Sequence, residues 1–216
     1  MGVSACRCDG CDAMFGEKGA RRAVVRYLEK GLGGEAPLLA DWASEGGLEG
    51  ASVLEVGGGV GQLQAELLRR GAVTGTVVEL VAAYEPYAAE LAAAVGVGER
   101  SSFVVADLTA DGDEVPAADM VVLRRVVCCS PRGIELLGAA AARTRRVLVA
   151  SYPRRSWWVR VVVRLQNVAF ALLRREFRVY VHDPASLEAA AAAHGLTWAQ
   201  RQRGPVWESV AFARPR

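Results

Sequence analysis

Val53-Leu54-Glu55-Val56-Gly57-Gly58-Gly59-Val60-Gly61 is the stretch that decides the fold of this chain. Residues 51–56 form a short apolar, β-branched run, and residues 57–61 supply a turn with almost no side chains. From Gln62 to Arg70 the apolar residues recur at helical spacing. A strand, a glycine turn and a helix in this order bring backbone N–H groups and the positive end of a helix up to a ligand. The stretch therefore predicts the first strand and turn of a nucleotide-binding sheet.

The acid inside this stretch restricts the ligand. Glu55 precedes the first glycine by two positions, and a carboxylate there would repel a phosphate group. No Gly-Lys-Ser or Gly-Lys-Thr follows the glycines, which excludes a P-loop. A ligand with a positive end, such as an ammonium or a sulfonium group, suits this acid.

Further strands follow at regular spacing, and two of them end in acids. Residues 74–79 predict a second strand that ends in Glu79, and residues 101–106 a third strand that leads into Asp107 and Leu108. Residues 119–123 and 145–150 predict a fourth and a fifth strand, and helical, Ala-rich segments at 84–95 and 132–143 lie between strands. Alternating strands and helices indicate a parallel sheet.

These features resemble the motifs of class I S-adenosylmethionine-dependent methyltransferases, whose first motif is usually E/D-x-G-x-G-x-G. The resemblance covers residues 50–150 and, more weakly, the remainder. It implies S-adenosylmethionine as the cofactor, with Glu79 on the ribose hydroxyls and Asp107-Leu108 beside the adenine. The residues that we expect to bind the cofactor are Glu55, Gly57, Gly58, Gly59, Gly61, Glu79, Leu80, Asp107, Leu108 and Arg125.

Composition limits the partners only loosely. The 216 residues, 52% of them hydrophobic, suffice for one domain with its own core. A net charge of +2 argues neither for nor against nucleic acid, and we expect no nucleic-acid partner. No uncharged apolar run of membrane-spanning length occurs, and the first residues lack a basic and then apolar signal region. A cytoplasmic location is therefore the default expectation, and the oligomeric state stays open.

Five cysteines gather in two places, at Cys6, Cys8 and Cys11 and at Cys128-Cys129. In a reducing cytosol we do not expect structural disulfides. The N-terminal three are dense enough for zinc or an iron–sulfur cluster but need a fourth ligand. If the N-terminal segment folds over the pocket, Cys128 or Cys129 would supply it. The competing interpretation, a flexible tip and buried apolar filling, is slightly favoured, and metal binding stays open.

The first 50 residues predict a helical cap. Residues 15–32 form one or two amphipathic helices, and residues 37–44 a further helix. In the family that the chain resembles, such a segment commonly lies over the cofactor and shapes the acceptor pocket, which makes Tyr27 a candidate substrate-binding residue. A helix that simply covers one face of the sheet is the plain alternative.

Residues 123–131, after the fourth strand, depart from the common forms of that family. Polar or Glu-His residues often stand where Arg125 and Cys128-Cys129 stand here, and no ready general base is present. Arg124 or Arg125 would receive a carboxylate of the acceptor, or would pair with a neighbouring acid; the two interpretations stay open. Arg124, Cys128 and Cys129 are candidate substrate-binding residues.

Residues 154–178 predict a basic amphipathic helix with two tryptophans. Such a helix lies on an anionic membrane surface or packs its apolar face over a pocket. We favour the pocket, with Trp157 as a candidate substrate-binding residue, and keep weak membrane-surface contact through residues 154–178 as the alternative. The two roles are compatible.

The segment that follows contains Tyr180-Val181-His182, and residues 145–200 loosely resemble magnesium-protoporphyrin O-methyltransferases, which carry a Tyr-Leu-His at a similar place. The resemblance implies an aromatic or macrocyclic acceptor, including one that bears a carboxylate. Tyr180 is a candidate substrate-binding residue, and His182 is the candidate general base, against the alternative of a structural surface histidine. His194 reads as the C-terminal residue of a helix.

The expected fold is α/β: a Rossmann-like three-layer sandwich with a seven-stranded, mostly parallel sheet and a closing antiparallel hairpin at residues 196–202 and 206–212. We expect one domain over residues 1–216. Its parts are a helical cap (1–50), a cofactor-binding core (51–150), and an amphipathic insert with the closing hairpin (151–216).

The predicted function is methyl transfer from S-adenosylmethionine to a small hydrophobic or aromatic molecule. Two alternatives belong to other classes. One is a nicotinamide-dependent oxidoreductase, which Glu55, Asp107-Leu108 and the closing hairpin disfavour. The other is a non-catalytic cofactor-binding or metal-binding regulator on the same fold.

Overall fold

Short apolar strands alternate with helices along most of the chain, and a computed structural model describes how residues 10–215 arrange them. Residues 1–9 and 216 lie outside the described residues. The seven strands are β1 (Ser52–Val56), β2 (Thr74–Glu79), β3 (Ser101–Val105), β4 (Ala118–Arg124), β5 (Thr144–Pro153), β6 (Thr197–Arg203) and β7 (Trp207–Ala213). The α-helices are α1 (Cys11–Met14), α2 (Glu17–Lys30), α3 (Ala36–Ser44), α4 (Gln62–Arg69), α5 (Glu85–Ala94), α6 (Gly133–Ala142), α7 (Trp157–Leu172) and α8 (Pro184–Ala192).

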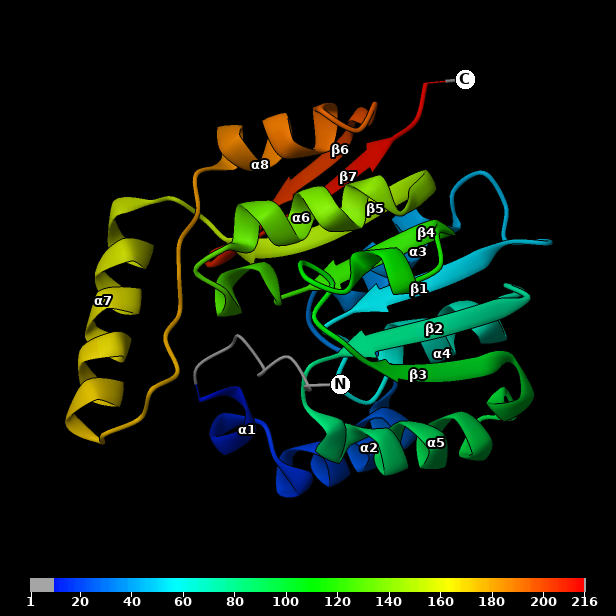
Figure 1. Cartoon of the computed structure of the whole chain (residues 1–216), viewed down its shortest axis with the longest axis horizontal. Coiled ribbons are helices and arrows are strands. Elements are labelled where there is room, and N and C mark those ends of the chain that lie inside the picture. Colours follow the sequence, from blue (N-terminus) through cyan, green and yellow to red (C-terminus); the bar gives the residue numbers. More distant parts are fainter. Residues whose placement is uncertain (1–9, 216) are drawn as a thin grey trace.

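All seven strands form one sheet in the order β3-β2-β1-β4-β5-β7-β6. The first five pair in parallel, whereas β7 runs antiparallel to both β5 and β6. The central strands are apolar on both faces and almost entirely buried, as parallel strands covered by helices require. The order of the strands reverses between β1 and β4: β2 and β3 lie to one side of β1, and β4 and β5 lie to the other. The carboxyl ends of the parallel strands point to one side of the molecule (Figure 1). Ligands of open α/β sheets bind beside such a reversal of strand order.

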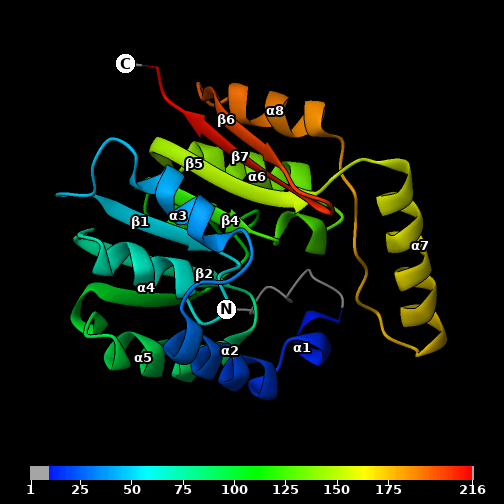
Figure 2. The same ribbon diagram turned by 180° about the vertical axis from the view of Figure 1, so that it is seen from behind.

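Helices cover both faces of the sheet. One buried cluster joins α2, α3, α4 and α5 to one face, through residues such as Leu39, Leu63 and Met120. A second cluster joins α6 and α8 to the other face, through Leu137, Leu187 and Phe212. Figure 2 shows the first group from its own side. The result is a three-layer α/β sandwich.

The helix α7 belongs to neither layer. It stands beyond the carboxyl ends of the parallel strands, and residues 174–183 return alongside it to α8 (Figure 1). Asn167 fastens it to the returning segment, since its side chain bonds both the O and the N–H of Val179, at 2.8 and 2.9 Å. None of the helices between residues 10 and 215 combines the length and apolar character needed to cross a bilayer.

The predicted fold class is confirmed: the sheet is seven-stranded and mostly parallel, and an antiparallel hairpin closes it. Most element boundaries lie within a few residues of the expected ones. The main difference is the N-terminal helical region, which consists of a short α1 and a separate α2 because Phe15 and Gly16 interrupt the helix.

Candidate functional site

The glycine turn lies between β1 and α4, at the carboxyl edge of the sheet. Gly57, Gly59 and Gly61 adopt φ values of +62°, +57° and +73°, which residues with a side chain rarely adopt. A Cβ on Gly57 would also lie 2.7 Å from the Cβ of Val126, in the segment after β4. The turn therefore brings bare backbone to the point where β1 and β4 end.

Glu55 is a buried carboxylate directly behind this turn. Its Oε2 accepts the backbone N–H of Gln64 at 2.7 Å, in the first turn of α4. A Cβ on Gly58 would lie 2.6 Å from the Cγ of Glu55, so the glycine provides the room for this side chain. Burial raises the pKa of Glu55 from 4.5 to about 7, although the hydrogen bond from Gln64 opposes the shift. A cation placed against Glu55 would stabilise its ionised form.

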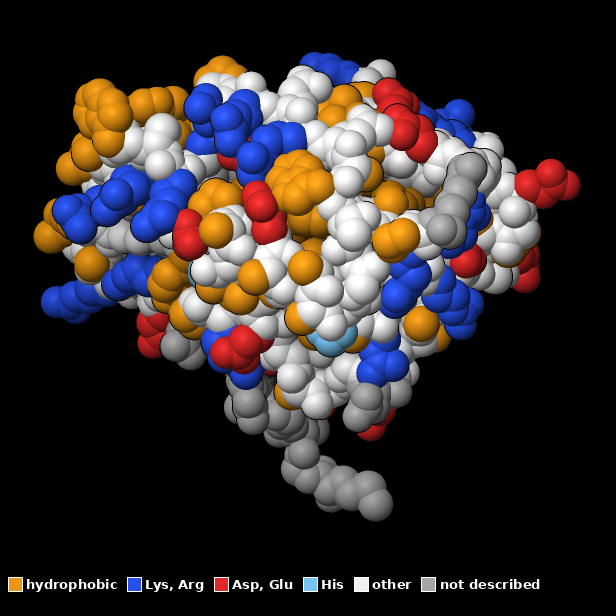
Figure 3. Space-filling model, turned by 90° about the horizontal axis from the view of Figure 1, so that it is seen from above, with side chains coloured by type: hydrophobic (Ala, Val, Ile, Leu, Met, Phe, Trp, Pro, Cys, Tyr) orange, Lys and Arg blue, Asp and Glu red, His pale blue; other side chains and the backbone are white. Residues whose placement is uncertain are grey.

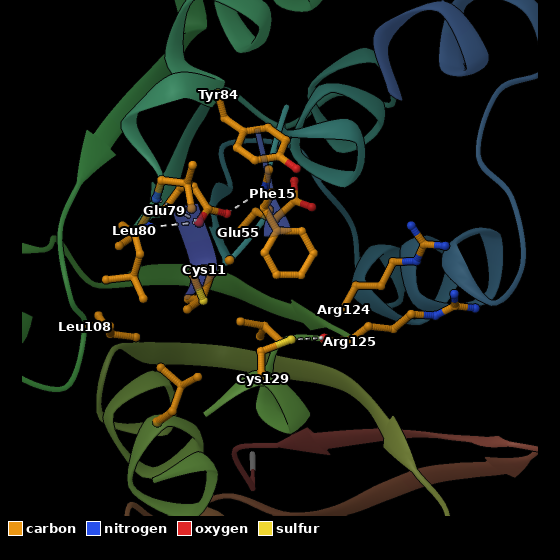
Figure 4. A pocket seen from close by; sticks show the side chains of 18 of the residues that line it. Cys11, Phe15, Glu55, Glu79, Leu80, Tyr84, Leu108, Arg124, Arg125 and Cys129 are labelled. Carbon is orange, nitrogen blue, oxygen red and sulfur yellow. Dashed lines mark hydrogen bonds between the residues drawn. The ribbon is translucent and has the colours of Figure 1, made fainter. Parts of the chain in front are cut away.

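Glu79, the last residue of β2, lies beside Glu55 and bonds the glycine turn (Figure 4). Its Oε2 accepts the N–H of Gly59 at 2.9 Å, and its Oε1 accepts those of Leu80 and Val81 at 2.8 and 3.2 Å. The carboxylate thus holds the glycine turn and the start of the next loop together. It also lines the cavity between them.

Asp107 lies two residues after β3. Its Oδ1 accepts the N–H and the hydroxyl of Thr109, at 2.9 and 2.6 Å, and its Oδ2 lies 3.6 Å from Nη2 of Arg132. Leu108 beside it is buried. The carboxylate is held in place from both sides at the rim of the cavity.

These residues line a cavity of about 310 Å³. Every residue that the sequence assigned to the cofactor lines it except Gly61, which caps the N-terminus of α4. The cofactor-binding candidates on its wall are Glu55, Gly57, Gly58, Gly59, Glu79, Leu80, Asp107, Leu108 and Arg125.

A second, more apolar cavity of about 220 Å³ adjoins the first. Its walls come from α7, from the segment after β4 and from residues around Phe177 and Trp207. Phe15, Arg125 and Cys129 line both cavities and therefore mark their junction. The inner face of α7 contributes Trp158, Val159, Val162, Val163 and Gln166.

Arg124, the last residue of β4, and Arg125, which follows it, both pair with Glu35, just before α3. Arg125 bonds the carboxylate through two nitrogens, Nε at 2.6 Å and Nη2 at 2.5 Å, and Nε of Arg124 lies 3.3 Å from it. Burial acts to raise the pKa of Glu35, but the bond from Arg125 and the charges of both arginines lower it below 4.5. The neighbouring-acid interpretation thus describes the pairing, while two cations against one anion leave a positive charge beside the cavities.

Arg125 itself has an unusual backbone, with φ at +56°. Its guanidinium lies over the ring of Trp207, 4.4 Å from the centroid, and its carbonyl accepts the thiols of Cys128 and Cys129, each at 3.3 Å. Non-glycine residues in this region of φ are uncommon and cluster at functional sites.

The two adjacent thiols differ in position and in acidity. Cys128 is buried and lines only the apolar cavity, whereas Cys129 lies at the junction. The interaction between the two side chains lowers the pKa of Cys128, and the same interaction together with burial raises the pKa of Cys129. Cys129 is therefore a neutral thiol at physiological pH and no base.

The structure does not bring His182 to either cavity. Its Nε2 lies 3.0 Å from the carbonyl oxygens of both Val127 and Ser130, so that nitrogen carries a proton and donates it to the backbone. A Cβ on Gly133 would lie 2.7 Å from the Cδ2 of His182, which explains the glycine at the start of α6. The histidine contacts the loop after β4 through these two carbonyls, and a catalytic role for it stays a prediction.

Three substrate-binding candidates also lie elsewhere. The buried Tyr27 donates to Glu66 at 2.9 Å in the core, and burial and this bond raise the pKa of its hydroxyl to about 12. Trp157 is 77% exposed on the outer face of α7. Tyr180 bonds the carbonyl of Cys128 through its N–H at 2.8 Å and lines a groove beside α7.

For the cysteine hypothesis, Cys6 and Cys8 lie outside the described residues. Cys11 lines the first cavity, as Cys129 does, but it is disulfide-bonded, contrary to the expectation of reduced thiols. Within the described residues no group of three or more His, Cys, Asp or Glu side chains is arranged to hold a metal.

Comparisons with known proteins point to one fold. No family model and no curated protein matches the chain. The S-adenosylhomocysteine-bound magnesium protoporphyrin IX methyltransferase of Synechocystis superposes with a TM-score of 0.70 at 18% identity, over 94% of this chain and 97% of that one. An O-methyltransferase family 2 protein from Planctomyces limnophilus, in complex with apigenin, gives 0.66 at 21% identity, over 94% and 63%. The cyclase SpnF gives 0.61 at 13% identity, over 83% and 79%.

The chain has the Rossmann-like fold of the class I methyltransferases. At these identities the likeness concerns the fold alone, and the cyclase SpnF shares it, so the fold does not settle the chemistry.

Within this methyltransferase fold, four site residues escaped the sequence analysis. Tyr84 stands against the turn, since a Cβ on Gly59 would lie 3.2 Å from its ring. Glu35 holds the two arginines, and Phe15 lies at the junction of the cavities. Trp158, the neighbour of the candidate Trp157, faces the apolar cavity. The candidate that the sequence indicated for the pocket was Trp157, because α7 is apolar on two sides and helical spacing does not tell the two sides apart.

Proposed function

We propose that the protein is an S-adenosylmethionine-dependent methyltransferase that acts on a small hydrophobic or aromatic acceptor. The observation that carries the proposal is the cavity at the glycine turn, which Glu55, Glu79 and Asp107 line. S-adenosylmethionine offers an ammonium group, ribose hydroxyls and an adenine amino group, all of which donate hydrogen bonds to carboxylates. Neighbours in complex with S-adenosylmethionine or S-adenosylhomocysteine support the same cofactor.

The residues present fit this cofactor. Side chains at Gly57 or Gly58 would fill the cradle, since their Cβ atoms would meet Val126 or Glu55 at under 3 Å. The cavity volume of about 310 Å³ lies at the lower end of the range for small-molecule sites. In this assignment Glu79 binds the ribose hydroxyls, Asp107 and Leu108 border the adenine, and Glu55 faces the cationic end.

S-adenosylmethionine, when bound, would supply a methyl group on its sulfonium: the acceptor atom bonds to the methyl carbon as the carbon–sulfur bond breaks, and S-adenosylhomocysteine leaves. The contribution of the protein is to orient the acceptor and to exclude water. Phe15 and Cys129, at the junction of the two cavities, are uncharged and narrow the passage between them. Trp158 and Val162 of α7 close the acceptor side.

The second cavity supports the proposed class of acceptor. Its walls are apolar and aromatic, and Arg125 is the one charged side chain among the described residues that line it. Such a site suits a hydrophobic or aromatic molecule with an anionic or acidic group near the atom that is methylated. Among the described residues at the junction none is a base, because Cys129 is a neutral thiol and Arg125 is a cation. The acceptor atom is thus one that is nucleophilic without help, such as a carboxylate or an acidic phenol oxygen.

Calorimetric titration with S-adenosylhomocysteine tests the cofactor assignment. We expect binding in the micromolar range by the wild-type protein, no binding of a nicotinamide dinucleotide, and about tenfold weaker binding by Glu79→Gln. The exposed Glu49→Gln is the matched control and should bind like the wild type. Tight binding of the dinucleotide, or none of either ligand, would refute the proposal.

Methyl transfer is tested with radiolabelled S-adenosylmethionine and a panel of aromatic carboxylic acids and phenols. The rival function is a protein that binds the cofactor without transferring the methyl group. Two observations support this rival function. The described residues at the junction include no base, and the fold is shared with a cyclase. Cofactor binding without transfer to any panel member would support that rival.

A further inference from the structure

We propose that α7 is a docking helix for the surface of an anionic membrane. The helix has two apolar faces, and only the inner one is covered. Among its sixteen residues, Val159 alone is buried, and Val163 and Phe170 lie half-buried on the same side. At about 100° per residue these three lie within about 40° of one another around the axis. This inner face packs over the apolar cavity, which explains why its residues are apolar.

The outer face carries a continuous apolar stripe. Trp157, Val161, Leu165, Val168 and Leu172 are 77, 48, 64, 52 and 80% exposed. At about 100° per residue they lie within about 80° of one another, on the side opposite the inner face. Scattered exposed apolar residues are normal, but five in one stripe on one helix mark an interaction surface.

Positive charge flanks this stripe. Residues 154–178 contain seven arginines and one acid, Glu176. Arg155 pairs with Asp183 at 2.6 Å, but no carboxylate of the described residues pairs with Arg160, Arg164 or Arg174. Arg160 and Arg164 line a groove of about 540 Å³ between α7 and residues 179–181. Figure 3 shows hydrophobic and basic side chains gathered together on the side of the molecule where α7 lies.

An anionic lipid surface matches this combination. A helix with apolar side chains flanked by arginines inserts the apolar stripe at the boundary of headgroups and acyl chains, while the cations meet lipid phosphates. Tryptophan, at one end of the stripe, prefers this boundary. The helix lies on the membrane and does not cross it.

A second copy of the chain fits the same surface poorly. A two-fold contact through α7 would bring each helix against its own copy. Arg160 and Arg164 of the helix would then approach the same arginines of the other copy, and α7 carries no acid to offset them. Charge complementarity therefore favours an anionic membrane.

Sedimentation of the full-length protein with lipid vesicles tests the inference. We expect it to bind mixed phosphatidylcholine–phosphatidylglycerol vesicles about tenfold or more tightly than pure phosphatidylcholine, with the difference shrinking as salt is raised. Leu165→Glu with Leu172→Glu should abolish binding. The control pair, Val25→Glu with Val73→Glu, changes side chains that are 46 and 45% exposed elsewhere in the fold and should leave binding unchanged.

A second pair of variants separates local from overall charge. Arg160→Gln with Arg164→Gln should weaken binding about tenfold, whereas Arg21→Gln with Arg22→Gln, which removes the same charge from exposed positions on α2, should not. Equal losses in the two pairs would overturn the assignment to α7. A second outcome would also overturn it: the wild-type protein is a dimer that does not bind vesicles, and Leu165→Glu with Leu172→Glu converts that dimer to a monomer. No acceptor or cofactor is needed, so the outcome is independent of the proposed methyl transfer.

Discussion

The carboxylates around the cavity differ in the number of hydrogen bonds that each accepts from the protein. Glu79 accepts three backbone N–H groups and Asp107 accepts two donors from Thr109, so both are held in place. Glu55 accepts few bonds and is fully buried, and burial raises its pKa to about 7. The most deeply buried acid is therefore the one whose charge depends most on a ligand.

The first prediction concerns the pH dependence that Glu55 imposes. Its folded-state pKa of about 7 exceeds the 4.5 of an unfolded glutamate, so the unfolded chain releases the proton first as the pH rises. The stabilising contribution is complete below pH 4.5 and is lost as the pH rises through about 7. Glu55→Gln should remove this loss. Between pH 4.5 and pH 8 the free energy of unfolding of the variant should therefore rise by about 3 kcal/mol relative to that of the wild type. Urea unfolding at both pH values measures it, with the exposed Glu49→Gln as the control.

The second prediction concerns close approach at the glycine turn. Gly57→Ala meets both a φ of +62° and the side chain of Val126, whereas Gly50→Ala meets a φ of +71° and open space. We expect Gly50→Ala to cost about 1–2 kcal/mol and to keep cofactor binding. Gly57→Ala should cost at least about 2 kcal/mol more and lose S-adenosylhomocysteine binding. Equal destabilisation in thermal unfolding would show that Val126 moves aside freely.

The two sides of helix α7 face different surroundings. Its inner side forms a wall of the apolar cavity, and its outer side is exposed. Adjacent residues point about 100° apart on a helix, so the two tryptophans at its start serve different surfaces. Closing an apolar cavity requires an apolar inner side. It does not explain why the outer stripe of α7 is apolar as well.

The third prediction uses these adjacent tryptophans. Trp158→Ala removes a half-buried ring from the wall of the apolar cavity and should lower the free energy of unfolding by about 2 kcal/mol. Trp157→Ala changes an exposed ring and should stay within about 0.5 kcal/mol of the wild type. With any acceptor found in the panel, Trp158→Ala should raise KM more than it lowers kcat. Equal effects of the two substitutions on stability would contradict the two-sided arrangement.

Across the whole molecule, contacts between distant segments complete the site. Glu35, from the N-terminal region, joins Arg124 and Arg125 after β4, and its Oε1 also accepts the hydroxyl of Ser151 in β5 at 3.3 Å. Trp207, at the start of β7, lies under Arg125. The junction of the two cavities therefore depends on the N-terminal region, the centre and the C-terminal hairpin of the chain together.

The fourth prediction tests Glu35 as the residue that connects them. Its folded pKa is lowered, so its contribution is present above pH 4.5 and is lost as the pH falls through the folded value. Glu35→Gln should cost about 1–2 kcal/mol at pH 7, because it leaves two partly exposed arginines without their carboxylate. The difference from the wild type should shrink as the pH approaches the folded pKa of Glu35. Unfolding curves across this range measure it, and the exposed Glu29→Gln should show no such trend.

The core of the fold was predictable from the sequence because its signals are local. The glycine turn, the strands ending in Glu79 and before Asp107, and the apolar runs of β4 and β5 each follow from neighbouring residues. Strand order and right-handed crossovers then bring the carboxyl ends to one edge. Glu55, Glu79 and Asp107 were for this reason expected together, and the cavity contains all three.

Tertiary structure alone decided which side chains complete that edge. No local pattern shows that Glu35 pairs with arginines some 90 residues away, that His182 donates to the backbone of Val127 and Ser130, or that Trp158 faces inward while Trp157 faces outward. Such contacts depend on the packing of segments far apart in the chain. The sequence determined the sheet, its glycine turn and its acids through residue spacing, and packing decided the acceptor side through distances that spacing does not encode.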